Sequence, residues 1–337
     1  MKKKLLIVYA GGTIGMKKSE EGWKPAPGLL ETQMRDNPVF HNEIMPQFDI
    51  KELHPLLDSS DMSPEDWLQI ARLIEQNYHD YHGFLVLHGT DTMAYTASGV
   101  SFFLEGLTKP VIFTGSQIPM IEPRNDAVEN LVGALLFAAN FDIQEVCVFF
   151  DSFLMRGCRS VKVNSGSFNA FDSPNFPHLG EGGIYQKVNP SLLWKTKFKE
   201  LYVQPKKEVN VGVIWLFPGI TGEVVKNFLA PPLKGAVLKA FGVGNGPVKN
   251  KAFLQAIQEA NDRGVVIVDC TQCLKGTVYL GDYATGSGLA KAGVISGFDM
   301  TTEAALAKLF YLFSKGLSSE EVKDWMVQNL RGELSII

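Results

Sequence analysis

The chain has 337 residues, of which 45% are hydrophobic and 20% charged, and its formal net charge is −4. This length exceeds what one hydrophobic core usually serves, so we expect two domains. The slight negative charge gives no electrostatic reason to bind nucleic acid or an anionic membrane, and no apolar stretch approaches the ~20 residues of a membrane span.

The N-terminus carries three lysines and then a short apolar run, at residues 5–10, that ends in Gly11 and Gly12. A secretory signal peptide also starts with lysines, but its apolar region is longer and is followed by a small-residue cleavage site. We therefore expect this run to be a buried first strand.

Further strands are predicted from short apolar runs rich in β-branched and aromatic residues, at residues 84–87, 111–114 and 146–150. Helical patterns lie between these runs, at residues 63–78, 92–106 and 126–140. The first helix begins with Ser63 as N-cap, Pro64 at the first helical position and acidic residues in the first turn. Strands that alternate with helices predict a mainly parallel sheet with helices on both faces.

Residues 157–183 are rich in Ser, Asn, Gly, Phe and Pro, and the basic, Pro-containing residues 187–208 indicate a linker. Strand patterns then resume at residues 211–217, 236–241 and 265–269, and helical patterns occur at residues 224–228, 249–263, 302–313 and 319–329. We predict a larger N-terminal α/β domain with a mainly parallel sheet, a linker, and a smaller C-terminal α/β domain of flavodoxin-like type, at residues 1–186, 187–208 and 209–337.

The four cysteines, Cys147, Cys158, Cys270 and Cys273, are too few for a disulfide scaffold in a chain of this length. Cys270 and Cys273 form a C-x-x-C, as a redox site or half of a zinc site would. A zinc site needs a second pair or nearby histidines, and the sequence places none close by. Thiols at the end of a buried strand are the favoured interpretation.

Ligands of open α/β sheets bind beyond the carboxyl ends of the strands, so the loops there are the first to consider. The loop after the first strand holds Thr13 between glycines, which let the backbone turn sharply and approach a ligand closely. It is not a phosphate-binding loop, because Met16 stands where that motif needs glycine. A glycine-rich tight turn is the simpler alternative.

Two more loops lie directly ahead of predicted helices. Thr90 and Asp91 place a hydroxyl and a carboxylate at a helix N-terminus, where backbone donors are free. Residues 58–61 offer two acids and two hydroxyls, which suit the ammonium and the carboxylate of an amino acid. Helix capping is the alternative for both loops.

Lys162 lies between Val161 and Val163, both strand formers. A lysine in an alternating strand usually points to solvent, whereas a buried lysine loses its proton readily and can act as a base. The sequence leaves both alternatives open.

These segments together resemble one family. AGGTIG (10–15), DSSDM (58–62), HGTDTMAYTA (88–97), TGSQIP (114–119) and GVGNGP (242–247) are similar to segments of the bacterial-type L-asparaginases. The resemblance is closest to the cytoplasmic type I group and spans essentially the whole chain, down to NLRGEL (329–334). The first and third of these motifs, in this order and separation, are highly specific as a pair.

The resemblance implies a cytoplasmic hydrolase that converts L-asparagine to L-aspartate and ammonia, with weak glutaminase activity as a further expectation. It implies that Thr13 is the nucleophile and that Thr90, Asp91 and Lys162 form a second catalytic group that handles protons. The residues implied to hold the α-carboxylate and α-amine of the substrate are Asp58, Ser59, Ser60, Thr90 and Asp91. The chemistry requires no metal and no organic cofactor.

The resemblance also implies an assembly of identical subunits. The family forms homodimers or homotetramers with sites at the domain interface, and Asn245 matches a loop that neighbours the partner subunit's site. A small-molecule substrate and other copies of the chain are therefore the expected partners, without nucleic acid or membrane.

Two departures from the family pattern matter. The family's lid usually carries a tyrosine near the nucleophile, but Trp23 stands here, and an indole cannot accept a proton. Type I members can also bind a second asparagine at an allosteric site, and the matching candidate positions are Lys239, Thr271, Gln272, Cys273 and Thr301. Lys239 stands where arginine is common, and lysine cannot form the bidentate carboxylate fork of arginine.

Other functions remain as alternatives. An amidotransferase subunit that delivers ammonia to a partner would need a distinct partner-binding region, and the sequence offers no extra domain for it. A non-catalytic amino-acid sensor on the same fold would have lost some of Thr13, Thr90, Asp91 and Lys162. A Rossmann dehydrogenase is disfavoured, because residues 242–246 lack the G-x-G-x-x-G spacing.

Overall fold

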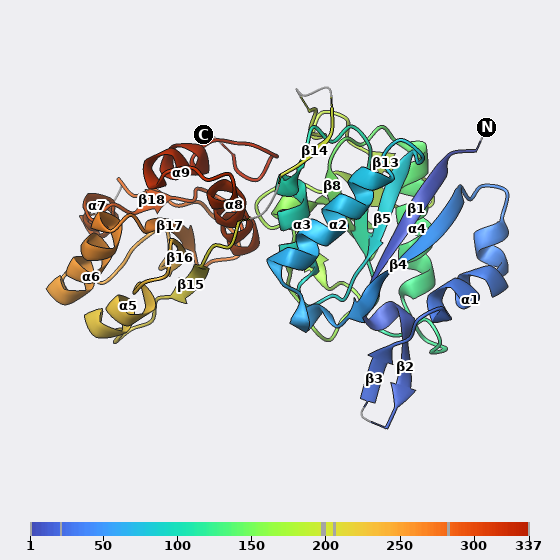
Figure 1. Cartoon of the computed structure of the whole chain (residues 1–337), viewed down its shortest axis with the longest axis horizontal. Helices are drawn as coiled ribbons and strands as arrows, with labels where there is room; N and C mark the ends of the chain where they lie inside the picture. Colours follow the sequence, from blue (N-terminus) through green and yellow to red (C-terminus); the bar gives the residue numbers. More distant parts are fainter. Residues whose placement is uncertain (1, 21, 197–199, 205–206, 282–283, 336–337) are drawn as a thin grey trace. The chain divides into compact units, whose positions relative to one another are not determined.

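The computed structural model describes residues 2–20, 22–196, 200–204, 207–281 and 284–335 (Figure 1). The chain divides into two compact units, Met1–Val203 and Gln204–Ile337, called unit 1 and unit 2 below. Among the described residues, no helix is both long enough and apolar enough to cross a lipid bilayer.

An eight-stranded sheet forms the centre of unit 1, in the spatial order β13-β12-β9-β8-β7-β5-β1-β4. Its strands are β1 (Lys4–Gly11), β4 (Gln47–Leu57), β5 (Gly83–Leu87), β7 (Val111–Thr114), β8 (Val146–Phe150), β9 (Phe153–Arg156), β12 (Gly180–Gly182) and β13 (Gln186–Val188). The five strands from β8 to β4 are parallel to one another, and the other three pair antiparallel. The prediction of a mainly parallel sheet is confirmed.

Helices cover both faces of this sheet (Figure 1). They are α1 (Leu29–Asp36), α2 (Pro64–Gln76), α3 (Met93–Phe103) and α4 (Ala127–Asn140). Leu5 and Ile7 of β1 belong to the same buried cluster as Leu131 of α4, and the residues between them face the opposite side of the sheet. The predicted start of α2 is confirmed by a capping box, in which Asp66 accepts from the backbone N–H and the hydroxyl of Ser63.

Three pairs of short strands complete the described part of unit 1. A hairpin follows β1, formed by β2 (Met16–Ser19) and β3 (Gly22–Pro25). The short strands β10 (Val161–Lys162) and β11 (Phe171–Asp172) pair antiparallel, and β6 (Leu104–Glu105) pairs with β14 (Tyr202–Val203). Parts of the segment expected as a linker, residues 187–208, thus belong to unit 1, because β13 and β14 both pair with its strands.

Unit 2 contains a four-stranded parallel sheet of β15 (Val211–Trp215), β16 (Gly235–Ala240), β17 (Val266–Thr271) and β18 (Ile295–Ser296). Its helices are α5 (Gly222–Phe228), α6 (Lys251–Asp262), α7 (Ala284–Lys291), α8 (Thr302–Ser314) and α9 (Ser319–Met326). The predicted smaller α/β unit is confirmed. Its described strands lie side by side in chain order, because each connection returns to the position next to the strand it left. In a flavodoxin sheet, by contrast, the first two strands are exchanged.

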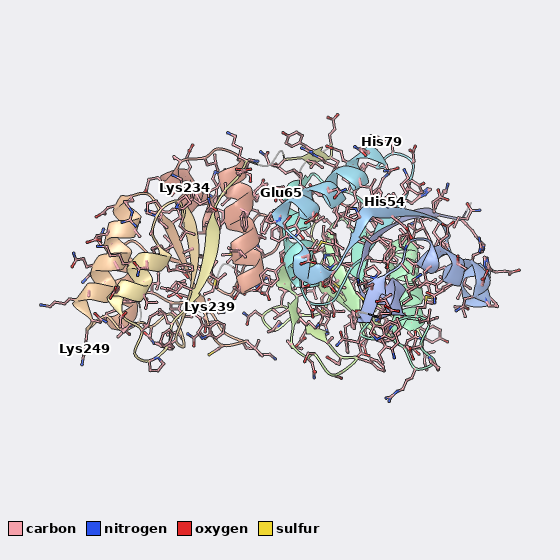
Figure 2. All side chains as sticks on the ribbon, turned by 60° about the horizontal axis from the view of Figure 1, so that its bottom comes forward. His54, Glu65, His79, Lys234, Lys239 and Lys249 are labelled. Atoms are coloured by element: carbon pink, nitrogen blue, oxygen red, sulfur yellow. The ribbon has the colours of Figure 1, made fainter. Side chains whose placement is uncertain are left out.

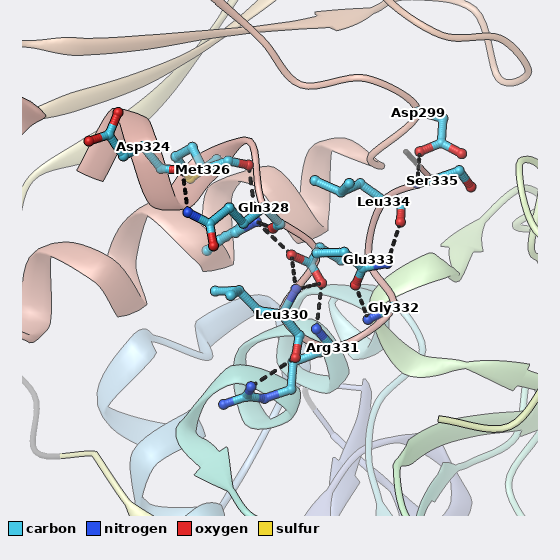
Figure 3. A network of polar contacts seen from close by, with 12 residues as sticks. Asp299, Asp324, Met326, Gln328, Leu330, Arg331, Gly332, Glu333, Leu334 and Ser335 are labelled. Atoms are coloured by element: carbon cyan, nitrogen blue, oxygen red, sulfur yellow. Dashed lines mark hydrogen bonds and ion pairs between the residues drawn. The ribbon is translucent and has the colours of Figure 1, made fainter. Parts of the chain in front are cut away.

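The C-terminal segment of unit 2 is attached to α8 by a buried ion pair. Lys308 Nζ donates to the Glu333 carboxylate at 2.6 Å and to the carbonyls of Met326 and Gln328, and both charged side chains have no exposed surface. The Glu333 carboxylate also accepts from the backbone N–H groups of Leu330 and Arg331 (Figure 3). The charges are therefore compensated, as buried ions must be.

Candidate active site

Gly12 holds the loop after β1 against the loop after β5. Its φ is 88°, and a Cβ at this position would lie 2.3 Å from the backbone nitrogen of Gly89. The Gly12 N–H also donates to the carbonyl of Leu57, the last residue of β4, at 3.2 Å. The loops after β1, β4 and β5 therefore meet at the carboxyl ends of three neighbouring parallel strands, where ligands of such sheets bind.

Thr13 follows Gly12 directly and opens the short 3-10 helix η1 (Thr13–Gly15). This turn is fixed by two backbone hydrogen bonds, from Met120 to the Ile14 carbonyl and from Ala26 to the Gly15 carbonyl, each 3.1 Å long. The Thr13 side chain is half-buried. Its hydroxyl is therefore carried by a fixed backbone beside the meeting point of the loops.

Ser59 packs directly beneath the loop after β5. A Cβ on Gly89 would lie 2.4 Å from the Ser59 hydroxyl oxygen, and the Thr92 hydroxyl donates to the Ser59 carbonyl at 2.6 Å. Asp58 accepts from the backbone N–H and the hydroxyl of Ser60, at 2.9 and 2.8 Å, and so caps the short 3-10 helix η3 (Ser59–Asp61). Asp58 therefore does not cap the helix that begins at Ser63, as the alternative for this loop supposed, and its exposed carboxylate keeps further lone pairs.

Lys162 reaches the two polar residues of the β5 loop. Its Nζ donates to Thr90 Oγ1 at 2.8 Å and to Asp91 Oδ1 at 2.6 Å. The Lys162 side chain is 18% exposed and that of Asp91 is 67% exposed, whereas Thr90 is buried. The structure therefore brings these three predicted residues together and does not leave Lys162 pointing away into solvent.

Gln117 is a polar contact of Thr90 to which the sequence analysis gave no role. The Thr90 hydroxyl donates to Gln117 Oε1 at 2.9 Å. Gln117 lies just beyond β7, the strand next to β5 in the sheet, within the segment TGSQIP. That position, one strand further along the same carboxyl edge, is the signal that would have identified it.

His88 supports this loop from below. The ring is fully buried, and its Nδ1–H donates to the Gly89 carbonyl at 2.7 Å. Burial lowers the pKa of His88 to about 4, so the ring is neutral at pH 7. We assign it a structural contribution, because a ring that stays neutral can hold the Gly89 backbone without adding charge.

Trp23 lies on β3 of the hairpin that follows η1, opposite Lys18 in the strand register. Its side chain is 40% exposed. The base of the hairpin is attached to the sheet, because the Gly28 N–H donates to the Glu52 carboxylate on β4 at 2.9 Å. The hairpin therefore projects from the unit at a fixed base.

The candidate effector residues gather in unit 2, at the carboxyl ends of β16 and β17. Figure 2 shows Lys239 at this end of β16 and Lys234 at the opposite end. Lys239 is buried, donates to the Thr271 carbonyl and lies 5.5 Å from the centre of the Trp215 ring. Gln272 donates to the Lys239 carbonyl at 2.8 Å, and the Cys273 N–H donates to the Thr271 hydroxyl at 3.0 Å.

The remaining predicted residues also lie in unit 2. Thr301 caps α8, and burial raises the pKa of the neighbouring Glu303, which the charge of Lys239 partly opposes. Asn245 accepts from the Thr285 hydroxyl at 2.5 Å. Cys270 is buried in β17 and Cys273 is exposed beyond its end, both as free thiols, and the described part of the chain groups no three His, Cys, Asp or Glu side chains as a metal site would.

The chain matches family models over most of its length. The asparaginase N-terminal model matches residues 4–195, and the glutaminase/asparaginase C-terminal domain model matches residues 210–326. The chain is also 52% identical to L-asparaginase 1 of Escherichia coli (strain K12) over 334 residues, which cover 99% of this chain and 98% of that protein.

Solved structures that are similar over the whole fold include two L-asparaginases. L-asparaginase I from Vibrio cholerae is 50% identical, with a TM-score of 0.93 and coverage of 100% of both chains. The thermostable L-asparaginase from Thermococcus kodakarensis is 33% identical, with a TM-score of 0.90 and coverage of 99% of this chain and 100% of that one. With the fold and the meeting of the three loops, these matches show that the chain belongs to the asparaginase family.

Proposed function

We propose that the chain hydrolyses the side-chain amide of L-asparagine to L-aspartate and ammonia, through a covalent acyl-threonine at Thr13. The observation that supports this most directly is the contact of Lys162 with Thr90 and Asp91, in the loop that packs against Gly12. A lysine, a buried hydroxyl and a carboxylate are thus held together at the loop that packs against Gly12, the residue before Thr13. L-asparaginase 1 of Escherichia coli, at 52% identity, adds support for the substrate.

The reaction divides into two steps. The Thr13 hydroxyl attacks the amide carbon while its proton passes to the pair formed by Thr90 and Lys162. Backbone N–H groups at the start of α3 stabilise the oxyanion, since the first N–H groups of a helix have no partner within it. The C–N bond then breaks, the nitrogen takes up a proton and leaves as ammonia, and water cleaves the acyl-enzyme to release aspartate.

Substrate recognition follows from charge and donor type. The exposed carboxylates of Asp91 and Asp58 suit the α-ammonium group of asparagine. The hydroxyls of Ser59 and Ser60 and the nearby backbone N–H groups suit its α-carboxylate. Glutamine, with one more methylene, would place its amide carbon differently, so we expect weak glutaminase activity at most.

Three further properties belong to the same proposal. We expect a cytoplasmic protein that forms homodimers or homotetramers, with the loop around Asn245 neighbouring the partner subunit's site. We also expect the cluster around Lys239 to bind a second asparagine as an effector. Its carboxylate would meet the buried amine of Lys239, and the raised pKa of Glu303 would limit the negative charge nearby.

The proposal is tested by ammonia release from asparagine and glutamine across a range of concentrations. Thr13→Ala should lower kcat by about 10³-fold or more, as loss of a nucleophile does elsewhere. Thr32→Ala is the matched control, because Thr32 is exposed on α1 and its hydroxyl bonds only to the local Gly28 carbonyl at 2.9 Å among the contacts described for it. Near-normal ammonia release from Thr13→Ala would refute the assigned nucleophile, and binding of asparagine without release would favour the sensor alternative.

A further inference from the structure

Gln117 connects three parts of unit 1 that are distant in sequence. Its Oε1 accepts from the Thr90 hydroxyl at 2.9 Å. Its Nε2 donates to the carbonyls of Ser165 and Ser167, at 3.3 and 3.2 Å, in the segment that follows Lys162. One amide therefore contacts both the hydroxyl that Lys162 touches and the loop that leads away from Lys162.

The backbone of Gln117 is itself held in place. Its N–H donates to both carboxylate oxygens of Asp126 at 3.0 Å, and the Ile118 N–H donates to the same carboxylate at 3.2 Å. Asp126 is buried just ahead of α4 and also accepts from Asn130 at 3.2 Å. The side-chain amide of Gln117 thus projects from a loop whose backbone is held in place by Asp126.

The partners of the amide fix which way it points. The carbonyls of Ser165 and Ser167 can only accept, so the NH2 group of Gln117 must face them. Its carbonyl oxygen then faces Thr90, and because that oxygen can only accept, Thr90 must be the donor in this contact. The assignment follows from the donor and acceptor types and not from a choice between nitrogen and oxygen.

The direction of the next contact follows. A threonine hydroxyl has one proton, and in this arrangement that proton is directed at Gln117. The contact of Thr90 with Lys162 therefore uses a lone pair of Thr90 and an N–H of Lys162. The donors run in one direction, from Lys162 to Thr90, from Thr90 to Gln117, and from Gln117 to the backbone.

We propose that Gln117 is a positioning residue for the amide hydrolysis: it aligns the Thr90 hydroxyl so that Thr90 accepts from Lys162, which leaves the lone pair of the amine to take the proton of Thr13. This inference rests on the proposed function, because it assigns Gln117 a part in the proton transfer that Thr90 and Lys162 carry out. Without the Gln117 acceptor, the Thr90 hydroxyl can rotate toward other acceptors and no longer holds the Lys162 amine in place for the proton of Thr13.

The first test is Gln117→Met, which keeps the length of the side chain and removes its acceptor and donors. We expect kcat for ammonia release from asparagine to fall about tenfold or more, because proton transfer depends on alignment, while KM changes little. Gln144→Met is the matched control, since Gln144 contacts the surface carboxylate of Asp142 and should leave kcat unchanged. Melting temperatures of both variants report whether the fold is kept.

A double-mutant cycle separates positioning from a general structural contribution. If Gln117 acts through Thr90, then Gln117→Met should cause no further loss of kcat in a Thr90→Val background. A loss that multiplies with that of Thr90→Val would overturn the inference. So would an active wild type whose kcat is unaffected by Gln117→Met, whereas a wild type that releases no ammonia would overturn the proposed function as well.

Gln117→Glu decides the question if Gln117→Met does not fold. The carboxylate still accepts from Thr90, but its negative charge favours the protonated forms of neighbouring groups, Lys162 among them. We expect the rising limb of the pH profile of kcat to move to higher pH. An unshifted profile with normal kcat would contradict the inference.

Discussion

The amine of Lys162 lies 2.8 Å from the hydroxyl of Thr90, although 72 positions separate the two residues in the sequence. Lys162 comes from the short strand β10, and Thr90 comes from the loop that follows β5. The contact selects between two alternatives that the sequence left open for Lys162, a side chain that points to solvent and one that joins the site. It also makes the two residues a unit that mutations can test.

Lys162→Met should lower kcat by about 10³-fold, because it removes the amine while keeping an unbranched chain of similar length. Thr90→Val should cost a similar factor, and the double variant should be little worse than either single variant, since the two residues act together. Steady-state ammonia release measures all three. Losses that multiply would show instead that Lys162 and Thr90 contribute independently.

Gly12→Ala should abolish most activity, because its Cβ would lie 2.3 Å from the Gly89 nitrogen and must push the two loops apart. Gly219→Ala separates this effect from backbone strain alone. Gly219 has a φ of 95°, close to the 88° of Gly12, but a Cβ there meets no atom within 4 Å. The control should lower the melting temperature slightly at normal activity, and equal activity in both variants would contradict the proposed loop contact.

Lys308→Met should destabilise the protein by about 3–5 kcal/mol, because it leaves the Glu333 carboxylate buried without its partner. Lys226→Met breaks a surface ion pair with Glu259 and should cost less than about 1 kcal/mol. Denaturant unfolding compares the two variants. If they unfold at the same denaturant concentration, then the buried pair does not hold the C-terminal segment as described.

Asp269→Asn should stabilise the protein more at pH 8 than at pH 5. Asp269 has no exposed surface, and burial raises its pKa to about 7 although the charge of Lys239 opposes the shift. The folded protein therefore keeps the proton that the unfolded chain loses near pH 4, so the stability this group contributes falls between about pH 4 and pH 7 and is fully lost above that window.

The difference between pH 5 and pH 8 should approach about 3 kcal/mol in the free energy of unfolding, relative to the wild type. Asp142→Asn, a change of an exposed carboxylate, serves as the control. Thermal unfolding at the two pH values provides the measurement. A stabilisation that is larger at pH 5 would show that the sign of the pKa shift is wrong.

Lys239→Arg should sharpen the dependence of rate on asparagine concentration. Lysine binds a carboxylate as a point charge, so we expect the natural chain to give a hyperbolic or mildly sigmoidal curve. Arginine adds a second charge-assisted hydrogen bond, and the effector should then bind about tenfold more tightly. A steeply sigmoidal curve for the natural chain that Lys239→Ala abolishes would show that lysine suffices and that the bidentate contact of arginine is not needed.

The buried strands β1, β5, β7, β8, β16 and β17 could be predicted because each is a short apolar run, whereas the buried strand β9 was missed. The same reasoning missed β4, Gln47–Leu57, in which acids, lysine, histidine and proline are interspersed among apolar residues. It is an edge strand of the sheet and pairs only with β1 among the described strands. Many of its side chains are therefore exposed or only partly buried, and polar residues are tolerated there. The hairpin of β2 and β3 was missed for a related reason, because most of its residues are exposed.

Site residues were predictable where they directly follow a predicted strand in the sequence. Thr13, Thr90 and Asp91 follow strands directly, so their positions at the carboxyl edge follow from the parallel sheet. Lys162 could not be placed in this way, and for Gln117 the strand end gives the position but not the contact with Thr90. Lys162 comes from a two-residue strand outside the main sheet, and the contact of Gln117 with Thr90 depends on the packing of loops 27 positions apart.

The two backbone hydrogen bonds at Ile14 and Gly15 lie between Thr13 and the hairpin that carries Trp23. A hairpin that closed over a substrate would pull on the chain it continues from. The N–H of Ala26, the residue directly after β3, closes the base of the hairpin at Gly15, and the Met120 N–H holds the chain one residue earlier, at Ile14. A hairpin that swings about this base therefore meets the Met120 contact before its movement can reach Thr13.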